Sequence, residues 1–72
     1  EKFFTNLKER YPDLTPGDLR LCALLRLNMP TKDMARMQNL SVRGIEAARY
    51  RLRKKLNLPE GQSLVDFMIQ FH

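Results

Sequence analysis

The sequence predicts an all-α fold, a small bundle of four to five helices that contains a helix-turn-helix. Three observations support this prediction. Apolar residues recur at helical spacing along most of the 72 residues. Residues that favour helix starts precede the apolar stretches, and no segment has a convincing strand pattern. The composition, 43% hydrophobic and 29% charged, is typical of a globular domain and not of a disordered chain.

The first helix is predicted over residues 1–11, with aromatic residues at helical spacing. We expect Phe3 or Phe4 to pack on the body of the domain. The alternative is that this helix is the stub of a linker to an upstream domain. Residues 1–13 are therefore interpreted as a lead-in helix, and residues 14–72 as the helix-turn-helix domain.

The most apolar helix of the chain is predicted to begin at Thr15. Thr15 and Asp18 have the spacing of a capping box, with Asp in place of Glu, and Pro16 suits a first helical turn. The helix ends before Pro30, and we expect it to be the central helix. Its apolar residues are Leu21, Cys22, Leu24, Leu25 and Leu27.

A short helix over roughly residues 32–38 is predicted next. Thr31 is its expected cap, and Asp33 lies in the first turn, where the helix dipole favours an acid. We expect Met34, Ala35 and Met37 to form its packing face.

Residues 38–40 are predicted to form a turn. Asn39 can adopt a left-handed conformation, and Leu40 is expected to pack between the helices on either side. Ser41 then caps the next helix. A helix, a turn of about three residues and a second capped helix together form a helix-turn-helix.

The excess positive charge of the chain lies in one segment, residues 41–57. This segment holds six of the 13 basic residues and one of the eight acids, a balance of +5. The whole chain is also +5, so the remaining residues carry seven charges of each sign and cancel.

On a helix, this segment has two different faces. The face predicted to pack inward consists of Ile45, Ala48, Leu52 and Leu56. The nearly opposite stripe consists of Arg43, Ala47, Tyr50 and Lys54, with Glu46, Arg51 and Arg53 on its flanks. A cationic stripe of this kind is typical of a helix that reads the major groove. The alternative interpretation is a solvated basic face, but Glu46 is the only acid available for pairing within the helix.

A last helix is predicted over residues 64–71, where Ser63 and Asp66 have the spacing of another capping box. This helix is apolar nearly all round, more than one core face requires. Its extra face either packs on the lead-in helix or forms an association surface. The dimerisation candidates are Leu64, Phe67, Met68 and Phe71.

Several function classes are disfavoured by the composition. A domain of 72 residues is too small for a cleft walled by two layers, so we expect no enzyme. The single histidine, His72, leaves almost nothing for a metal site or a histidine-based catalytic pair, and we expect no cofactor. No apolar run approaches the roughly 18 residues that span a membrane. Cys22 is interpreted as a buried thiol in a reducing compartment, with a redox sensor as the alternative.

Several motifs follow the register of a known family. They are Leu14-Thr15-x-x-Asp18, Lys32-Asp33-Met34-Ala35, Leu40-Ser41, Ile45 and Lys55-Leu56. The chain resembles the LuxR/GerE-type helix-turn-helix domain, whose pattern reads LTxxE, KEIA, a hydrophobe followed by Ser, then TV and KL. The resemblance runs from about residue 14 to 70. The stretches LRLCALLRLN and ARYRLRKKLNLP look most like the C-terminal DNA-binding domains of Bacteroidetes transcriptional regulators.

The resemblance implies a domain that places the second helix of the motif in the major groove. Members commonly bind as homodimers through the last helix, and a sensor or repeat domain precedes the module. The family's base-facing positions fall on Glu46, Ala47 and Tyr50. The chain departs from the family's pattern at Gln38 (usually Leu), Gly44 (usually Thr), Glu46 (usually Lys) and Ala48 (usually His).

The sequence therefore predicts a cytoplasmic bacterial transcriptional regulator that binds specific double-stranded DNA, with residues 42–57 in the major groove. Because the chain starts without methionine and in mid-pattern, we expect it to be part of a longer protein. The alternatives are a promoter-reading domain of a sigma factor and a helical protein-interaction module that uses the apolar last helix. The predicted base-facing residues are Arg43, Glu46, Ala47, Tyr50 and Lys54, and the predicted phosphate-contacting residues are Lys32, Ser41, Arg51, Arg53 and Lys55.

One basic residue of this segment has a different expected role. Arg49 lies close to the inward face, so we expect it to pair with Asp18 or Asp33 inside the domain.

Overall fold

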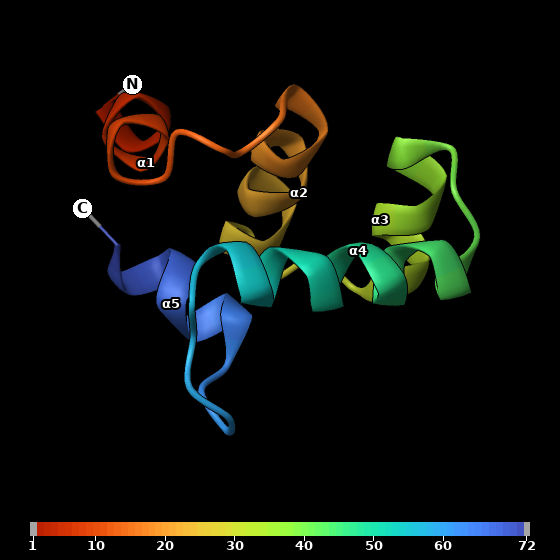
Figure 1. Ribbon diagram of the computed structural model, residues 1–72. Helices are drawn as coiled ribbons and strands as arrows, with labels where there is room; N and C mark the ends of the chain where they lie inside the picture. The colour runs from red at the N-terminus through yellow and green to blue at the C-terminus, as the bar shows by residue number, and fades with distance from the viewer. Residues whose placement is uncertain (1, 72) are drawn as a thin grey trace.

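The computed structural model describes residues 2–71. Over this range its regular secondary structure consists of helices joined by turns and loops, without strands (Figure 1). The predicted all-α fold is therefore confirmed. His72, the single histidine of the chain, lies outside the described residues. The helices within that range are α1 (Lys2–Arg10), α2 (Pro16–Arg26), α3 (Thr31–Gln38), α4 (Val42–Lys55) and α5 (Leu64–Gln70).

One apolar core joins all five of these helices. α2 lies in the middle of the arrangement, with α1 and α5 on one side and α3 on the other, and α4 runs across from α3 toward α5 (Figure 1). No polar or charged side chain is buried among the described residues, so burial of apolar area is the main force that holds the helices together. The buried residues are Phe3, Leu7, Leu14, Leu21, Cys22, Leu24, Leu25, Met34, Ala35, Ile45, Leu52, Leu56, Leu64 and Met68.

Side-chain caps begin three of the helices, as predicted. At α2, the Asp18 amide donates to Thr15 Oγ1 at 3.1 Å, and the Thr15 amide donates to Asp18 Oδ2 at 2.9 Å. At α4, Ser41 Oγ accepts from the Gly44 amide at 3.0 Å. At α5, Ser63 Oγ accepts from the Asp66 amide at 3.2 Å, which is one half of the predicted capping box.

The predicted cap of α3 is wrong. Thr31 is the first residue inside the helix, and Pro30 occupies the capping position without a side-chain hydrogen bond. The reason is that Pro30 is held in an extended conformation (φ −61°, ψ 149°) from which its carbonyl accepts from the amides of Asp33 and Met34, both at 3.0 Å.

The same device ends α2, α3 and α4: an asparagine in the left-handed conformation followed by an apolar residue. Asn28, Asn39 and Asn57 each have φ 56°. In each case the asparagine amide and the next amide donate back to carbonyls of the last turn, which is a Schellman motif. At α3, the Asn39 amide donates to Arg36 and the Leu40 amide donates to Ala35, at 3.2 and 2.9 Å. The predicted left-handed turn at Asn39 is therefore confirmed.

Three predicted core residues lie at the surface. Met37 is 66% exposed, Leu40 is 50% exposed and Leu27 is 71% exposed. α3 buries only Met34 and Ala35, so its last turn carries Met37 outward. Leu40 follows the left-handed residue of the stop and does not fill the space between the two helices. Leu27 closes the last turn of α2 on the side away from the core.

Part of the extra apolar face of α5 packs against α1 and against Tyr11, the residue that follows α1, while Ile69 remains 51% exposed. The ring of Tyr11 lies 6.3 Å from that of Phe67 and 6.4 Å from that of Phe71, and Phe3 lies 6.1 Å from Phe71, all between centroids. Such aromatic pairs favour edge and tilted contacts. Of the two uses predicted for this face, the structure therefore supports packing on the lead-in helix.

Two of the four dimerisation candidates are inside the domain. Leu64 and Met68 point into the core and are buried, because α5 packs against α2 with this side. They are not available to a second copy. Phe67 and Phe71 are partly buried in the aromatic cluster with α1.

We predict that Leu25→Ala and Leu27→Ala differ sharply in their effect on the free energy of unfolding. Leu25 is 0% exposed, so its truncation leaves a cavity and should lower stability by about 2–5 kcal/mol. Leu27→Ala should change it by less than about 0.5 kcal/mol. Urea unfolding, monitored by far-UV circular dichroism, measures both. Equal losses of stability would contradict the burial of Leu25 and the exposure of Leu27.

A second prediction concerns the stop at Asn39. Asn39→Ala places an ordinary side chain in the left-handed region and should lower the free energy of unfolding by about 1 kcal/mol. Asn39→Gly should be neutral or slightly stabilising, because glycine has no Cβ. Asn6→Ala, the same exchange inside α1, is the matched control and should not destabilise. Thermal or urea unfolding of the three variants checks this, and a loss with glycine as large as with alanine would contradict it.

Candidate nucleic-acid interface

α4 separates its residues into a buried face and an exposed face as the periodicity predicts. Ile45 and Leu52 are buried in the core, and Leu56 is buried where the helix ends. Tyr50, on the opposite side, is 61% exposed. Burial of one side turns the other to solvent. The exposed residues of that side are Arg43, Glu46, Ala47, Tyr50 and Lys54, which we call the outer face of α4, and Arg51 is exposed on its flank.

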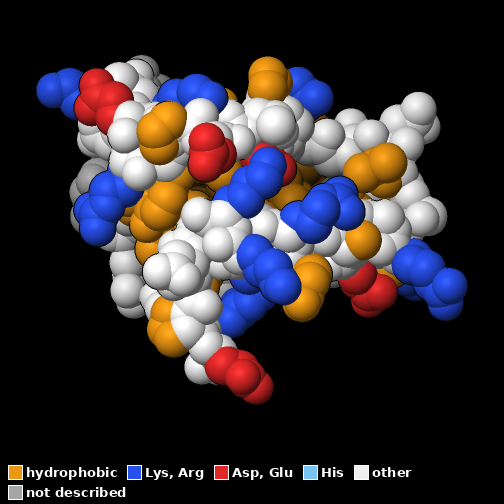
Figure 2. All heavy atoms as spheres, in the orientation of Figure 1, with side chains coloured by type: hydrophobic (Ala, Val, Ile, Leu, Met, Phe, Trp, Pro, Cys, Tyr) orange, Lys and Arg blue, Asp and Glu red, His pale blue; other side chains and the backbone are white. Residues whose placement is uncertain are grey.

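The outer face of α4 is cationic and largely unneutralised. Figure 2 shows Lys and Arg side chains gathered along α4 on the side turned to the viewer. No ion pair or hydrogen bond engages the side chains of Arg43 and Arg51 within residues 2–71. Lys54 Nζ lies 4.9 Å from the centroid of the Tyr50 ring, a cation–π contact that leaves its charge on the surface. This surface should attract a polyanion.

The turn between α3 and α4 has three residues, 39–41, and brings the two helices into contact. Gly44 lies close to two residues of this turn. A Cβ at Gly44 would lie 3.3 Å from Ser41 Oγ and 3.5 Å from Leu40 Cβ, so a larger residue would crowd the cap.

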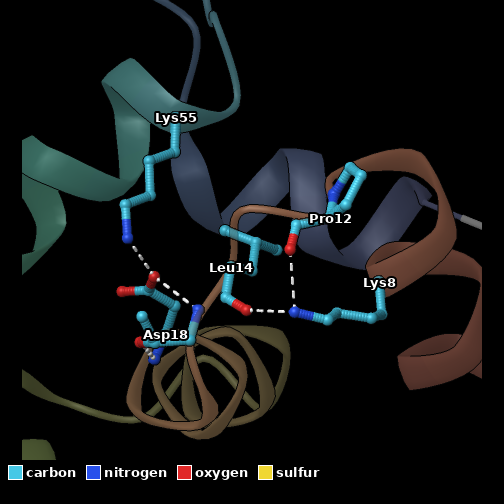
Figure 3. Close-up of polar contacts among 6 residues, drawn as sticks. Lys8, Pro12, Leu14, Asp18 and Lys55 are labelled. Carbon is cyan, nitrogen blue, oxygen red and sulfur yellow. Dashed lines mark hydrogen bonds and ion pairs between the residues drawn. The ribbon is translucent and has the colours of Figure 1, made fainter.

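The carboxylate of Asp18 ties the end of α4 to the start of α2. Lys55 Nζ reaches Asp18 Oδ2 at 2.5 Å, across 37 positions of sequence, as Figure 3 shows. Partial burial raises the pKa of Asp18, but the hydrogen bonds from Lys55 and Thr15 outweigh it, so the pKa lies below its usual 3.8. Lys55 thus has an internal partner. The expectation that Arg49 would pair with Asp18 or Asp33 is wrong: among residues 2–71 it has no ion pair with either, and Lys55 is the cation that reaches Asp18.

On the α1 side of the same region, Lys8 joins the connection between α1 and α2. Its Nζ donates to the carbonyls of Pro12 and Leu14 at 2.8 and 2.7 Å (Figure 3). These bonds hold the chain that leads into the cap of α2, next to the Asp18 carboxylate.

Arg53 also has partners inside the domain, so its guanidinium is not free to bind a phosphate of DNA. Its guanidinium donates to the carbonyls of Gln62 and Pro59, the latter at 2.9 Å. The loop after α4 folds back along the helix and presents these carbonyls to Arg53. Two of the five predicted phosphate contacts, Arg53 and Lys55, therefore hold the domain together, while Lys32, Ser41 and Arg51 remain exposed.

Sequence reasoning missed Arg36. Arg36 and Lys32 line one shallow hollow of about 380 Å³ between α3 and the start of α4. Arg36 is exposed. The hollow is lined further by Ala35, Asn39, Leu40 and Val42. The available signal was the spacing of Lys32 and Arg36, four residues apart and so on one face of α3.

Other chemistry finds little support in the described part of the chain. Cys22 is fully buried, and burial raises the pKa of its thiol to about 12, with Asp18 adding to the effect. A thiol of this kind is unreactive, which disfavours the redox sensor. Residues 2–71 contain no group of three or more potential metal ligands. None of the helices described is both long and apolar enough to cross a bilayer.

Comparison with known proteins gives no relative for this chain. No protein-family model, no curated protein and no solved structure matches it.

We predict that the ion pair between Lys55 and Asp18 contributes to stability only while Asp18 is ionised. The folded pKa of Asp18 is lowered, so the contribution is present above pH 3.8 and disappears as the pH falls through the folded pKa. Lys55→Ala should lower the free energy of unfolding by about 0.2–1 kcal/mol near neutral pH. That difference from wild type should shrink in acid.

Lys54→Ala is the matched control, because Lys54 is the neighbouring exposed lysine and has no ion pair among residues 2–71. Its difference from wild type should not vary with pH in the same range. Urea unfolding at a series of pH values measures all three proteins. A Lys55→Ala loss that stays constant down to the acid range would refute the role of this pair.

Proposed function

We propose that this domain binds double-stranded DNA by placing the outer face of α4 in the major groove. The observation that carries the proposal is that face itself: exposed, cationic, and presented by a helix whose opposite side is locked in the core. The short α3, the three-residue turn and α4 have the order of a helix-turn-helix, in which the second helix enters the groove.

The dimensions of α4 suit this role. Its 14 residues correspond to a length of about 21 Å at 1.5 Å per residue. A helix with its side chains is about 10–12 Å across, which matches a major groove about 12 Å wide. Ile45 and Leu52 are buried in the core. They fix the rotation of α4 about its axis, so the outer face stays turned toward the DNA.

The outer face of α4 offers several modes of base readout. The Glu46 carboxylate can accept from the amino group of cytosine, and Ala47 suits the methyl group of thymine. Arg43 can bind guanine with both arms of its guanidinium. Tyr50 lies one turn of the helix beyond Ala47, and Lys54 Nζ lies over its ring. This contact restricts where the side chains of Tyr50 and Lys54 point.

Phosphate contacts supply most of the affinity in complexes of this kind. Ser41, Arg51 and Lys32 remain suited to this role, and Arg36 adds a cation beside Lys32. Because Arg53 and Lys55 have partners within the domain, we expect fewer phosphate contacts than the count of basic residues suggests.

The biological setting that we propose follows from the resemblance to LuxR/GerE-type domains. In that setting the chain is the DNA-binding part of a cytoplasmic bacterial transcriptional regulator, and an upstream sensor or repeat domain controls it. The alternative of a protein-interaction module on the last helix has less support than the sequence alone gave it, because Phe3 and Tyr11 pack on Phe71 and Phe67 and only Ile69 of α5 is a large apolar residue more than half exposed among the residues described. The alternative of a sigma-factor promoter-reading domain would use the same face of α4 on DNA, and binding of the parent protein to core RNA polymerase separates the two.

The test is a salt titration of binding to a labelled duplex of mixed sequence. For the wild-type domain, log K should fall linearly with log salt. Arg51→Ala/Lys54→Ala should reduce the slope by one to two phosphate contacts, each worth about 0.9 in the slope. The control is Lys2→Ala/Arg10→Ala, which removes the same charge from exposed positions on α1.

The two double variants separate a specific face from general attraction. Equal loss of slope in both would mean that the net charge and not α4 attracts the DNA. Absence of binding by the wild-type domain at low salt, in single copy and as a covalently tethered pair, would overturn the proposal.

A further inference from the structure

A second basic feature lies beside α4, in a hollow of about 290 Å³ that the sequence did not suggest. It is bounded by the start of α2, by the turn after α3 and by one flank of α4. Arg20 comes from α2, Gln38 from the end of α3, and Arg51 from α4. Three helices that are separate in the sequence thus bring polar side chains to one depression.

The charge balance of this hollow is positive. Arg20 and Arg51 are both exposed, and neither has an ion pair or hydrogen bond within the part of the chain that the structure describes. The one acid in its lining, Asp18, is compensated by Lys55 and by the Thr15 amide. Two guanidinium groups therefore remain for an anion.

Arg20 is exposed, and its guanidinium lies beside the first turn of α2. Its Nη2 lies 3.8 Å from the position that a Cβ on Gly17 would occupy. This distance is an ordinary van der Waals contact, so the guanidinium lies close to the helix backbone beside the hollow. Gln38, half-buried at the end of α3, lines the same space with an amide that can donate a hydrogen bond.

The hollow lies where a DNA strand would pass. Arg51 is one residue beyond Tyr50, so it projects about 100° round the helix from the middle of the outer face. A helix about as wide as the major groove has a phosphate backbone along each side. With the outer face on the bases, the flank that carries Arg51 meets one of these backbones.

We propose that Arg20 and Arg51 clamp one backbone phosphate in this hollow, which makes α2 part of the DNA interface. Guanidinium groups bind phosphate with paired hydrogen bonds, a geometry that lysine does not reproduce. This inference rests on the proposed function. It adds a contact from outside the helix-turn-helix, and that contact fixes how far α4 can rotate in the groove.

The experiment measures binding of the domain to labelled duplexes of several sequences at fixed salt. Arg20→Ala should weaken binding by about tenfold, the effect of losing a hydrogen bond to a charged group. The loss should be similar for every sequence, because a phosphate contact carries no base information. Arg10→Ala, which removes the same charge from the exposed end of α1, should have little effect. Arg20→Lys keeps the charge and should recover only part of the affinity.

A double-mutant cycle tests whether the two arginines share one phosphate. Arg20→Ala/Arg51→Ala should weaken binding by less than the product of the single effects, because both side chains bind the same group. For Arg10→Ala/Arg51→Ala the effects should multiply. Circular dichroism melting of each variant shows whether it is folded.

The outcomes distinguish this inference from the proposed function. If Arg20→Ala behaves like Arg10→Ala while Arg51→Ala weakens binding, α4 reads DNA without α2 and the clamp is wrong. If the effects of Arg20 and Arg51 multiply, they act at different places and the shared site is wrong. If the wild-type domain does not bind DNA, the proposed function fails and the clamp fails with it.

Discussion

Burial of the inner face of α4 is the constraint on which the rest of the molecule depends. Ile45 and Leu52 are in the core, and that fixes the rotation of the helix about its axis. Once they are buried, Arg43, Tyr50 and Lys54 have to face solvent, because a helix places them on the other side. The apolar core and the cationic surface are therefore two consequences of one amphipathic pattern.

Rotation alone does not set the position of α4, and Asp18 supplies a second constraint. Its carboxylate closes the capping box of α2 and accepts from Lys55 at the far end of α4. The start of one helix and the end of another are thus joined through a single side chain. Arg53 does the same for the loop after α4, through carbonyls of that loop. Basic residues in this segment serve two purposes, and only those without internal partners are free to bind a polyanion.

The three asparagine stops determine how the helices are connected. Each of these asparagines adopts the left-handed conformation one or two residues after the last helical residue, and each is followed by an apolar residue. At Asn39 this leaves only three residues before α4 begins, which keeps α3 and α4 in contact. The same stop explains why Leu40 is exposed: its amide, and not its side chain, is what the turn uses.

The sequence by itself determined the features that depend on neighbours within one turn of helix. The caps at Thr15, Ser41 and Ser63, the left-handed Asn39 and the two faces of α4 all follow from spacings of two to four residues. Most of the outer face was therefore predictable, since exposure follows from periodicity once the inner face is known.

The tertiary structure alone decided which long side chains meet across elements. Lys55 and not Arg49 pairs with Asp18, Arg53 turns to its own loop, and Arg20 joins Arg51 beside one hollow. α5 packs against α2, which removes Leu64 and Met68 from any association surface. These contacts join residues far apart in the sequence. They depend on the relative positions of packed helices, which no local spacing encodes.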